Sequence, residues 1–163
     1  MSTLASRPRP AFGLPGRIQA PNSKPRSIAL IGLGDGGAAI ARRVADERPA
    51  NLEVHVLAKS AGGGGDPLAA IQAGGGDLQR DLASADMIFI VACRGDDVGL
   101  VPVVSGIAHS RKHPVTALYL VPPNAFRGGE EDETLKTLRG GVDMLVVVTD
   151  ESYVAAMIAA LAG

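Results

Sequence analysis

The chain has 163 residues, with 21 glycines, 11 prolines, one cysteine and no tryptophan. At this length one domain is the default, and its core needs neither a disulfide nor a metal for stability. A single cysteine forms no internal disulfide, which is typical of a reducing compartment, and no apolar run approaches the roughly 20 residues of a membrane-spanning helix. These features exclude a disulfide scaffold and predict a cytoplasmic protein without a membrane span.

Charge is unevenly distributed along the chain, although 16 basic and 17 acidic residues give a formal net charge of only −1. Residues 1–26 hold five basic side chains and no acidic one, whereas residues 27–163 hold the other 11 basic residues and all 17 acidic ones. The proline-rich composition of residues 1–26 predicts a disordered basic arm, either a solubilising leader or a contact for an acidic surface. The acidic body, residues 27–163, is not expected to bind nucleic acid.

Short runs rich in valine and isoleucine alternate along the body with segments of helical spacing. Strands are predicted at about 27–33, 52–58, 86–93, 115–121 and 142–148, and helices at about 37–48, 68–73, 77–84, 101–112, 131–139 and 151–162. Segments 86–93 and 142–148 contain runs apolar on both faces, as in strands covered by helices on each side. The pattern predicts an α/β fold with a doubly wound parallel sheet of about five strands.

A glycine-rich run, Gly32 to Gly37 (GLGDGG), follows the first predicted strand and opens the first predicted helix. Glycines allow a sharp turn and close approach of the backbone to a ligand, and free N–H groups at a helix N-terminus favour an anion such as phosphate. The run contains a G-x-G-x-x-G pattern, which is weak by itself and also occurs in a plain strand-to-helix turn. A dinucleotide-binding fold places an acidic residue at the end of its second strand, where it holds the ribose hydroxyls. Here Lys59 stands at that position. Because a lysine could face a 2′-phosphate instead, an NADP-binding domain remains an alternative.

Three stretches, in this order, resemble the FtsZ/tubulin family of GTPases, specifically the nucleotide-binding half of FtsZ. The run 32–37 resembles the first glycine-rich loop of the family. The runs 85–92 and 102–108 resemble the strand and the helix that flank the tubulin signature loop. The run 142–148 resembles the strand before the short helix that leads into the central helix of the family. The run 64–67 is similar to a remnant of the loop that contacts the terminal phosphate. The resemblance covers about residues 27–152 and implies the sheet order 2-1-3-4-5.

The same resemblance implies GTP or GDP as the ligand, with magnesium if a nucleotide binds. It brings the first glycine loop and the segment 95–99 together in one crevice at the carboxyl edge of the sheet. The candidate ligand-contacting residues are Gly32, Gly34, Asp35, Gly36, Gly37, Gly64, Gly65, Gly95, Asp96, Asp97 and Gly99.

Departures from the family weaken the nucleotide prediction. Where the family has a glycine- and threonine-rich phosphate loop, this chain has Asp96 and Asp97. A carboxylate about 5 Å from a phosphate charge costs on the order of 3 kcal/mol at an effective dielectric of 20. Alternatively, the two carboxylates could hold magnesium beside the phosphates. The resemblance does not extend to the central helix or to the acidic hydrolysis loop of the family, so GTP hydrolysis is not expected.

The sequence therefore predicts a non-hydrolysing FtsZ-like protein, a pseudo-GTPase, that binds protein partners. The partner is an FtsZ-type filament, which the chain would cap or modulate, or a second copy of itself. A small GTP- or nucleotide-binding regulator and the NADP-binding domain are the alternatives. No catalytic or metal-binding residue is predicted, and Cys93 is interpreted as a small apolar residue at the carboxyl end of a central strand, where α/β folds bind ligands.

Overall fold

A computed structural model describes residues 25–57, 78–124 and 132–162. In chain order its elements are β1 (Ile28–Leu33), α1 (Gly34–Asp46), β2 (Leu52–Leu57), α3 (Leu78–Ser84), β3 (Met87–Cys93), α4 (Val101–Ser110), β4 (Val115–Leu120), α5 (Glu133–Gly141), β5 (Met144–Val148) and α6 (Ser152–Ala162). The predicted helix at 68–73, Lys59, Gly64 and Gly65 lie outside the described residues, as does nearly all of the predicted arm.

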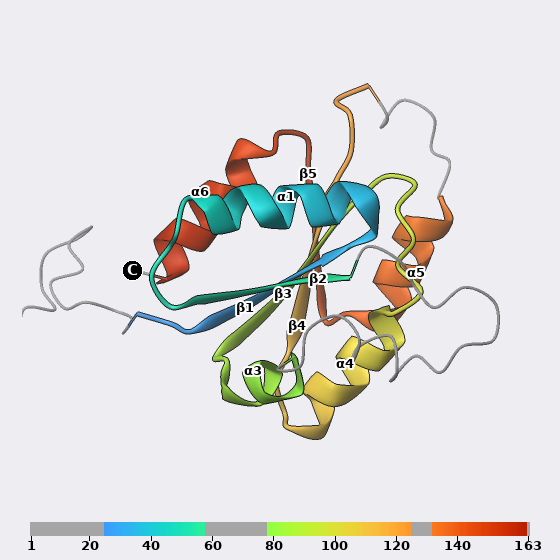
Figure 1. Cartoon of the computed structure of the whole chain (residues 1–163). Coiled ribbons are helices and arrows are strands. Elements are labelled where there is room, and N and C mark those ends of the chain that lie inside the picture. The colour runs from blue at the N-terminus through green and yellow to red at the C-terminus, as the bar shows by residue number, and fades with distance from the viewer. Residues whose placement is uncertain (1–24, 58–77, 125–131, 163) are drawn as a thin grey trace, which may run out of the picture.

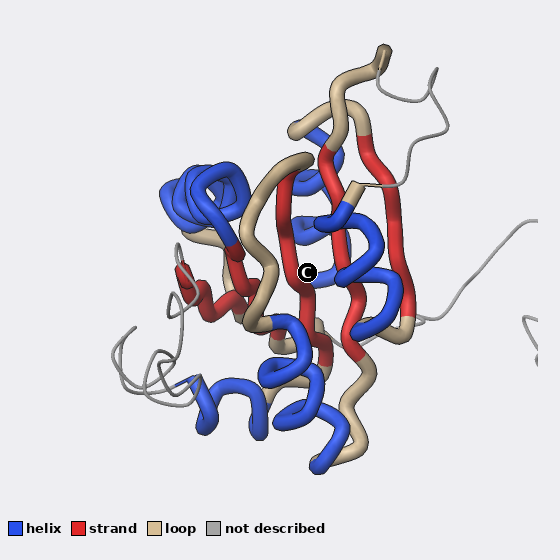
Figure 2. Tube along the Cα trace, turned by 90° about the vertical axis from the view of Figure 1, so that its right-hand side faces the viewer, coloured by secondary structure: helices blue, strands red, loops and turns tan. Residues whose placement is uncertain are grey.

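The strands form a parallel sheet of five in the order β2-β1-β3-β4-β5. Helices α1 and α6 cover one face, and α3, α4 and α5 cover the other, as Figures 1 and 2 show from two directions. The predicted doubly wound α/β class and the predicted strand order are therefore confirmed. The order reverses between β1 and β3, so their carboxyl ends form the topological switch point of the sheet.

Side chains of the central strands alternate between two apolar layers, as the two-residue period of a strand requires. In β1, Ala29 and Ile31 pack with α3 and α4, whereas Ile28 and Leu30 pack with α1 and α6. All six residues of β1 are buried, which is the environment of a strand covered on both faces. The two layers pack against both faces of β1 and β3, and these strands carry the loops at the carboxyl edge.

Several boundaries differ from the prediction by one to three residues, and two of these differences matter for the site and the sheet. Helix α1 begins at Gly34, three residues earlier than expected, because the glycine run itself forms its first turn. Strand β5 begins at Met144, and it lies at the edge of the sheet, so Met144 and Val147 remain 60% and 39% exposed. The expectation that helices cover both faces of the strand is confirmed for β3 and is wrong for β5. Within the described ranges, no helix has the length and apolar character needed to cross a membrane.

Candidate functional site

The carboxylate of Asp96 lies on the N-terminus of α1. Its Oδ1 accepts a hydrogen bond from the Gly36 N–H (3.0 Å), and its Oδ2 accepts from the N–H groups of Gly37 (2.8 Å) and Cys93 (2.7 Å). Hydrogen bonds to a charged acceptor and the helix dipole both stabilise a negative charge at this position. Two of these N–H donors belong to the glycine run to which the sequence assigned a phosphate, so a side chain of the protein occupies the predicted anion site.

The glycine run is shaped to fit this carboxylate and the end of β3. Gly34 has φ +72°, and a Cβ there would lie 2.5 Å from the Cβ of Asp96. A Cβ on Gly36 would lie 2.7 Å from the Cys93 sulfur, and one on Gly37 would lie 2.2 Å from the Val91 carbonyl oxygen. Contacts within the protein therefore account for these glycines without a bound ligand.

The loop after β3 is anchored on the far side by α5. The Thr134 hydroxyl, on a buried side chain, donates to the Asp96 carbonyl oxygen at 2.7 Å. Asp132 caps α5 by accepting from the Leu135 N–H at 2.6 Å, and it also accepts a hydrogen bond from the Tyr119 hydroxyl. The Thr134 contact holds the backbone of Asp96 while its side chain binds α1, and the Asp132 contacts hold the start of the helix that carries Thr134.

The other predicted residues occupy different environments. Asp35 is exposed in the first turn of α1, and Gly32 is buried beneath that turn. Asp97 is exposed, and its Oδ1 accepts from the Gly99 N–H at 2.9 Å within the same loop. Gly95 has φ +83° and faces open space. The structure thus brings Gly34, Gly36, Gly37 and Asp96 together, and the side chains of Asp35 and Asp97 take no part in these contacts. Asp97 and Gly99 line a hollow, which they share with Asp96 and α5.

A magnesium ion does not fit the pair Asp96 and Asp97 in this arrangement. Both oxygens of Asp96 face N–H donors, and one oxygen of Asp97 turns back to its own loop. Magnesium requires free oxygen ligands in nearly octahedral geometry. Over the part of the chain that the structure describes, no group of three histidine, cysteine or acidic side chains is placed to hold a metal.

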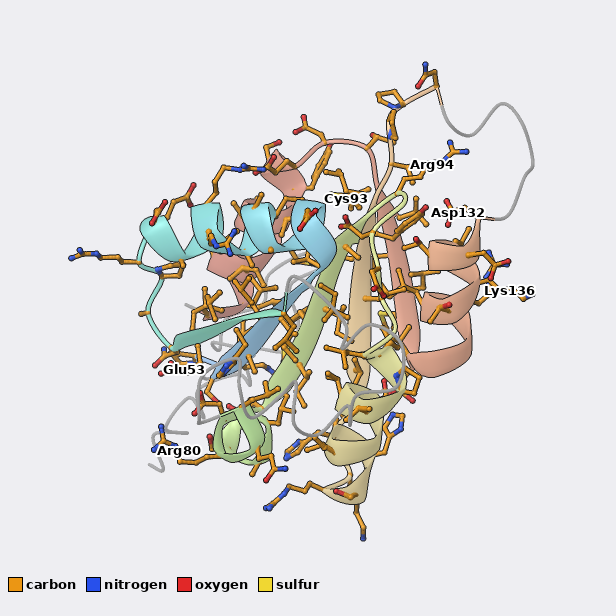
Figure 3. The ribbon with its side chains drawn as sticks, turned by 45° about the vertical axis from the view of Figure 1, so that its right-hand side comes forward. Glu53, Arg80, Cys93, Arg94, Asp132 and Lys136 are labelled. Atoms are coloured by element: carbon orange, nitrogen blue, oxygen red, sulfur yellow. The ribbon has the colours of Figure 1, made fainter. Side chains whose placement is uncertain are left out.

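A cavity of about 410 Å³ opens beside this site, at the carboxyl ends of β3, β4 and β5. It is lined by Cys93, Arg94, Leu120, Val121, Pro122 and Thr149. The Arg94 Nε lies 3.7 Å from Oδ2 of Asp132, and Figure 3 shows Cys93, Arg94 and Asp132 near the same edge of the sheet. Sequence reasoning missed Arg94, Asp132 and Thr149. The rule that placed Cys93 at a strand end applies equally to Arg94 and Thr149, and would have found both.

Cys93 is predicted to be a poor nucleophile. Burial is the largest cause that raises the pKa of its thiol to about 11, and the negative carboxylates of Asp96 and Glu151 add smaller contributions. Only the thiolate reacts with iodoacetamide. In short pulses, the alkylation rate of the folded protein is expected to rise about tenfold per pH unit beyond pH 9, whereas in urea it levels near the ordinary pKa of about 8.5. A plateau near pH 8.5 in the folded protein would contradict this assignment.

No family model matches the chain, and no curated protein matches it. Solved structures do match, and one is the crystal structure of a conserved protein from Enterococcus faecalis V583. It is 13% identical, the alignment covers 82% of this chain and 97% of that chain, and the TM-score is 0.42. A likeness at this level carries no argument about function. The fold and the site define a Rossmann-like α/β protein in which a carboxylate of the chain binds the N-terminus of its first helix.

Proposed function

We propose that this protein is a non-hydrolysing FtsZ-like protein, a pseudo-GTPase, that acts by binding a protein partner. The observation that carries the proposal is the Asp96 carboxylate on the N–H groups of Gly36, Gly37 and Cys93. A nucleotide phosphate and this carboxylate require the same donors, and both are negative. Binding of GTP would therefore require Asp96 to leave α1, at the cost of three hydrogen bonds.

The family part of the proposal is supported by the three sequence stretches and by a strand order, β2-β1-β3-β4-β5, that agrees with the resemblance. Members of that family assemble head to tail through the carboxyl edge of this sheet. In the proposal, the same edge of this chain docks on an FtsZ-type filament and caps or modulates it. Exposed residues of the loop after β3, such as Asp97 and Gly95, lie on the docking side.

The test is sedimentation of FtsZ from the same organism, assembled with GTP, in the presence of a stoichiometric amount of this protein. The proposal predicts that the protein pellets with the filaments or changes the pelleted fraction of FtsZ. Asp97→Lys, which reverses a charge on the docking side, is expected to weaken the effect.

The matched control is Asp46→Lys, which makes the same charge change on an exposed residue at the opposite edge of the sheet. It is expected to behave as the unmodified protein does. Normal assembly of FtsZ with none of this protein in the pellet would refute the filament proposal. Saturable GTP binding would instead favour the nucleotide-binding regulator.

A further inference from the structure

The second feature of the carboxyl edge is the 410 Å³ cavity beside the Asp96 site. Pockets for small ligands have volumes of about 300–1,000 Å³ and combine an apolar lining with a few polar groups. This cavity has that composition, because four of its six lining residues are Cys93, Leu120, Val121 and Pro122. It also lies outside the carboxyl ends of parallel strands, where open α/β sheets bind ligands.

The usual position for a ligand in this fold is the switch point itself, and the cavity lies next to it. The N–H donors at the switch point between β1 and β3 bind Asp96. The cavity is displaced across the sheet, at the ends of β3, β4 and β5, and its contacts do not depend on the glycine run. A ligand can therefore enter it while Asp96 stays on α1.

Arg94 supplies the cavity with a positive charge. Its side chain is 42% exposed, and its Nε lies 3.7 Å from Oδ2 of Asp132, beyond hydrogen-bond distance. Asp132 already accepts hydrogen bonds from the Tyr119 hydroxyl and the Leu135 N–H. Within the described part of the chain, the guanidinium therefore has donors to offer a planar carboxylate, which an arginine binds in a forked arrangement.

The surrounding charges favour a ligand with one negative charge over a phosphate. Burial raises the pKa of the Cys93 thiol most, and the nearby carboxylates of Asp96 and Glu151 raise it further, so negative groups already lie close to the cavity wall. The thiol is consequently neutral at pH 7 and lines the cavity as a small apolar group. Arg43 pairs with Glu151 through Nε–Oε1 and Nη2–Oε2 contacts of 2.5 and 2.9 Å, so it is engaged elsewhere. Among the described lining residues Arg94 is the only cation, and it also faces Asp132, so the cavity suits a single negative charge at most.

From these observations we infer that the cavity binds a small organic acid that carries one carboxylate on an apolar body. The carboxylate lies against the guanidinium of Arg94 and the hydroxyl of Thr149. The apolar body packs on Leu120, Val121 and Pro122. This site is separate from the proposed partner-binding role, and its test does not depend on FtsZ.

The test is a titration of the 15N-labelled protein with butyrate, hexanoate and benzoate, followed by backbone amide shifts. Hexanamide, which has the apolar body of hexanoate without its charge, is the matched neutral probe. The inference predicts saturable shifts at Arg94, Val121 and Thr149 with at least one acid, and binding at least about tenfold weaker for the matching amide. The bound acid should also slow alkylation of Cys93.

Two substitutions are expected to act in opposite directions. Arg94→Gln removes the guanidinium and is expected to weaken binding at least about tenfold. Asp132→Asn removes the competing charge but keeps an acceptor for the cap of α5, and is expected to strengthen binding. Arg111→Gln, at the opposite edge of the sheet, is the control and should leave binding unchanged.

The dispersion of the amide spectrum and the thermal midpoint establish that each variant is folded. The inference is overturned if none of the acids shifts these amides in a saturable way. It is also overturned if hexanamide binds as tightly as hexanoate, or if folded Arg94→Gln binds the acids as tightly as the unmodified protein.

Discussion

Asp96→Ala is expected to lower the free energy of unfolding by about 2–4 kcal/mol. The substitution leaves three N–H groups, those of Gly36, Gly37 and Cys93, without their charged acceptor. Each hydrogen bond to a charged group contributes about 1.5–3 kcal/mol, and water that enters this half-buried site recovers part of the total. Urea denaturation monitored by circular dichroism measures the change. Asp97→Ala, in the same loop, is the matched control and is expected to cost less, about 1 kcal/mol or below, because the Gly99 N–H that its carboxylate accepts from is exposed and water can replace that bond.

The same variant is expected to acquire an anion site. Once the carboxylate is removed, the N–H groups at the start of α1 are free to bind phosphate. Inorganic phosphate should therefore raise the thermal midpoint of Asp96→Ala and leave those of the unmodified protein and Asp97→Ala unchanged at equal ionic strength. An equal response from all three proteins would show that Asp96 does not block the site.

Gly37→Ala is expected to destabilise the protein by more than about 4 kcal/mol, or to prevent folding. The new Cβ would lie 2.2 Å from the Val91 carbonyl oxygen, a backbone atom of central strand β3 that cannot move aside. Helix α1 would have to shift away from the sheet and break its apolar layer, the kind of change that produces the largest effects of single substitutions. Soluble expression and urea denaturation check the expectation.

Gly106→Ala is the control for that substitution. Gly106 lies inside α4, and a Cβ added there meets no atom within 4 Å. Alanine favours a helix by about 0.5–1 kcal/mol over glycine, so this variant is expected to be as stable as the unmodified protein or slightly more stable. Similar losses in Gly37→Ala and Gly106→Ala would contradict the packing explanation for the glycine run.

The fold could be predicted because its signals are local. The apolar segments that became β1 and β3 are bounded by turns and alternate with helical spacing, and both are buried in the sheet. Edge exposure could not be predicted in this way. Met144 and Val147 have the same apolar pattern as the central strands, and their exposure depends on the place of β5 in the sheet.

The candidate site could be predicted only in part. The sequence placed Asp96 close to the glycine run and predicted that its charge opposes a phosphate. It did not indicate that the side chain itself binds the helix, since that depends on the loop backbone that Thr134 anchors from 38 residues away. The cavity, in contrast, was within reach of the sequence, because Arg94 and Thr149 follow predicted strands and the predicted strand order places the ends of β3, β4 and β5 side by side.

The most direct test of the central claim is calorimetric titration of the purified protein with GTP, GDP and NADP(H), with and without magnesium. The claim is that Asp96 closes the nucleotide site of this fold. It predicts no saturable heat for any of these ligands with the unmodified protein. Binding of GTP or NADP(H) with a dissociation constant near 1 µM, about −8 kcal/mol, would contradict it, because that affinity requires the α1 N–H groups that Asp96 occupies.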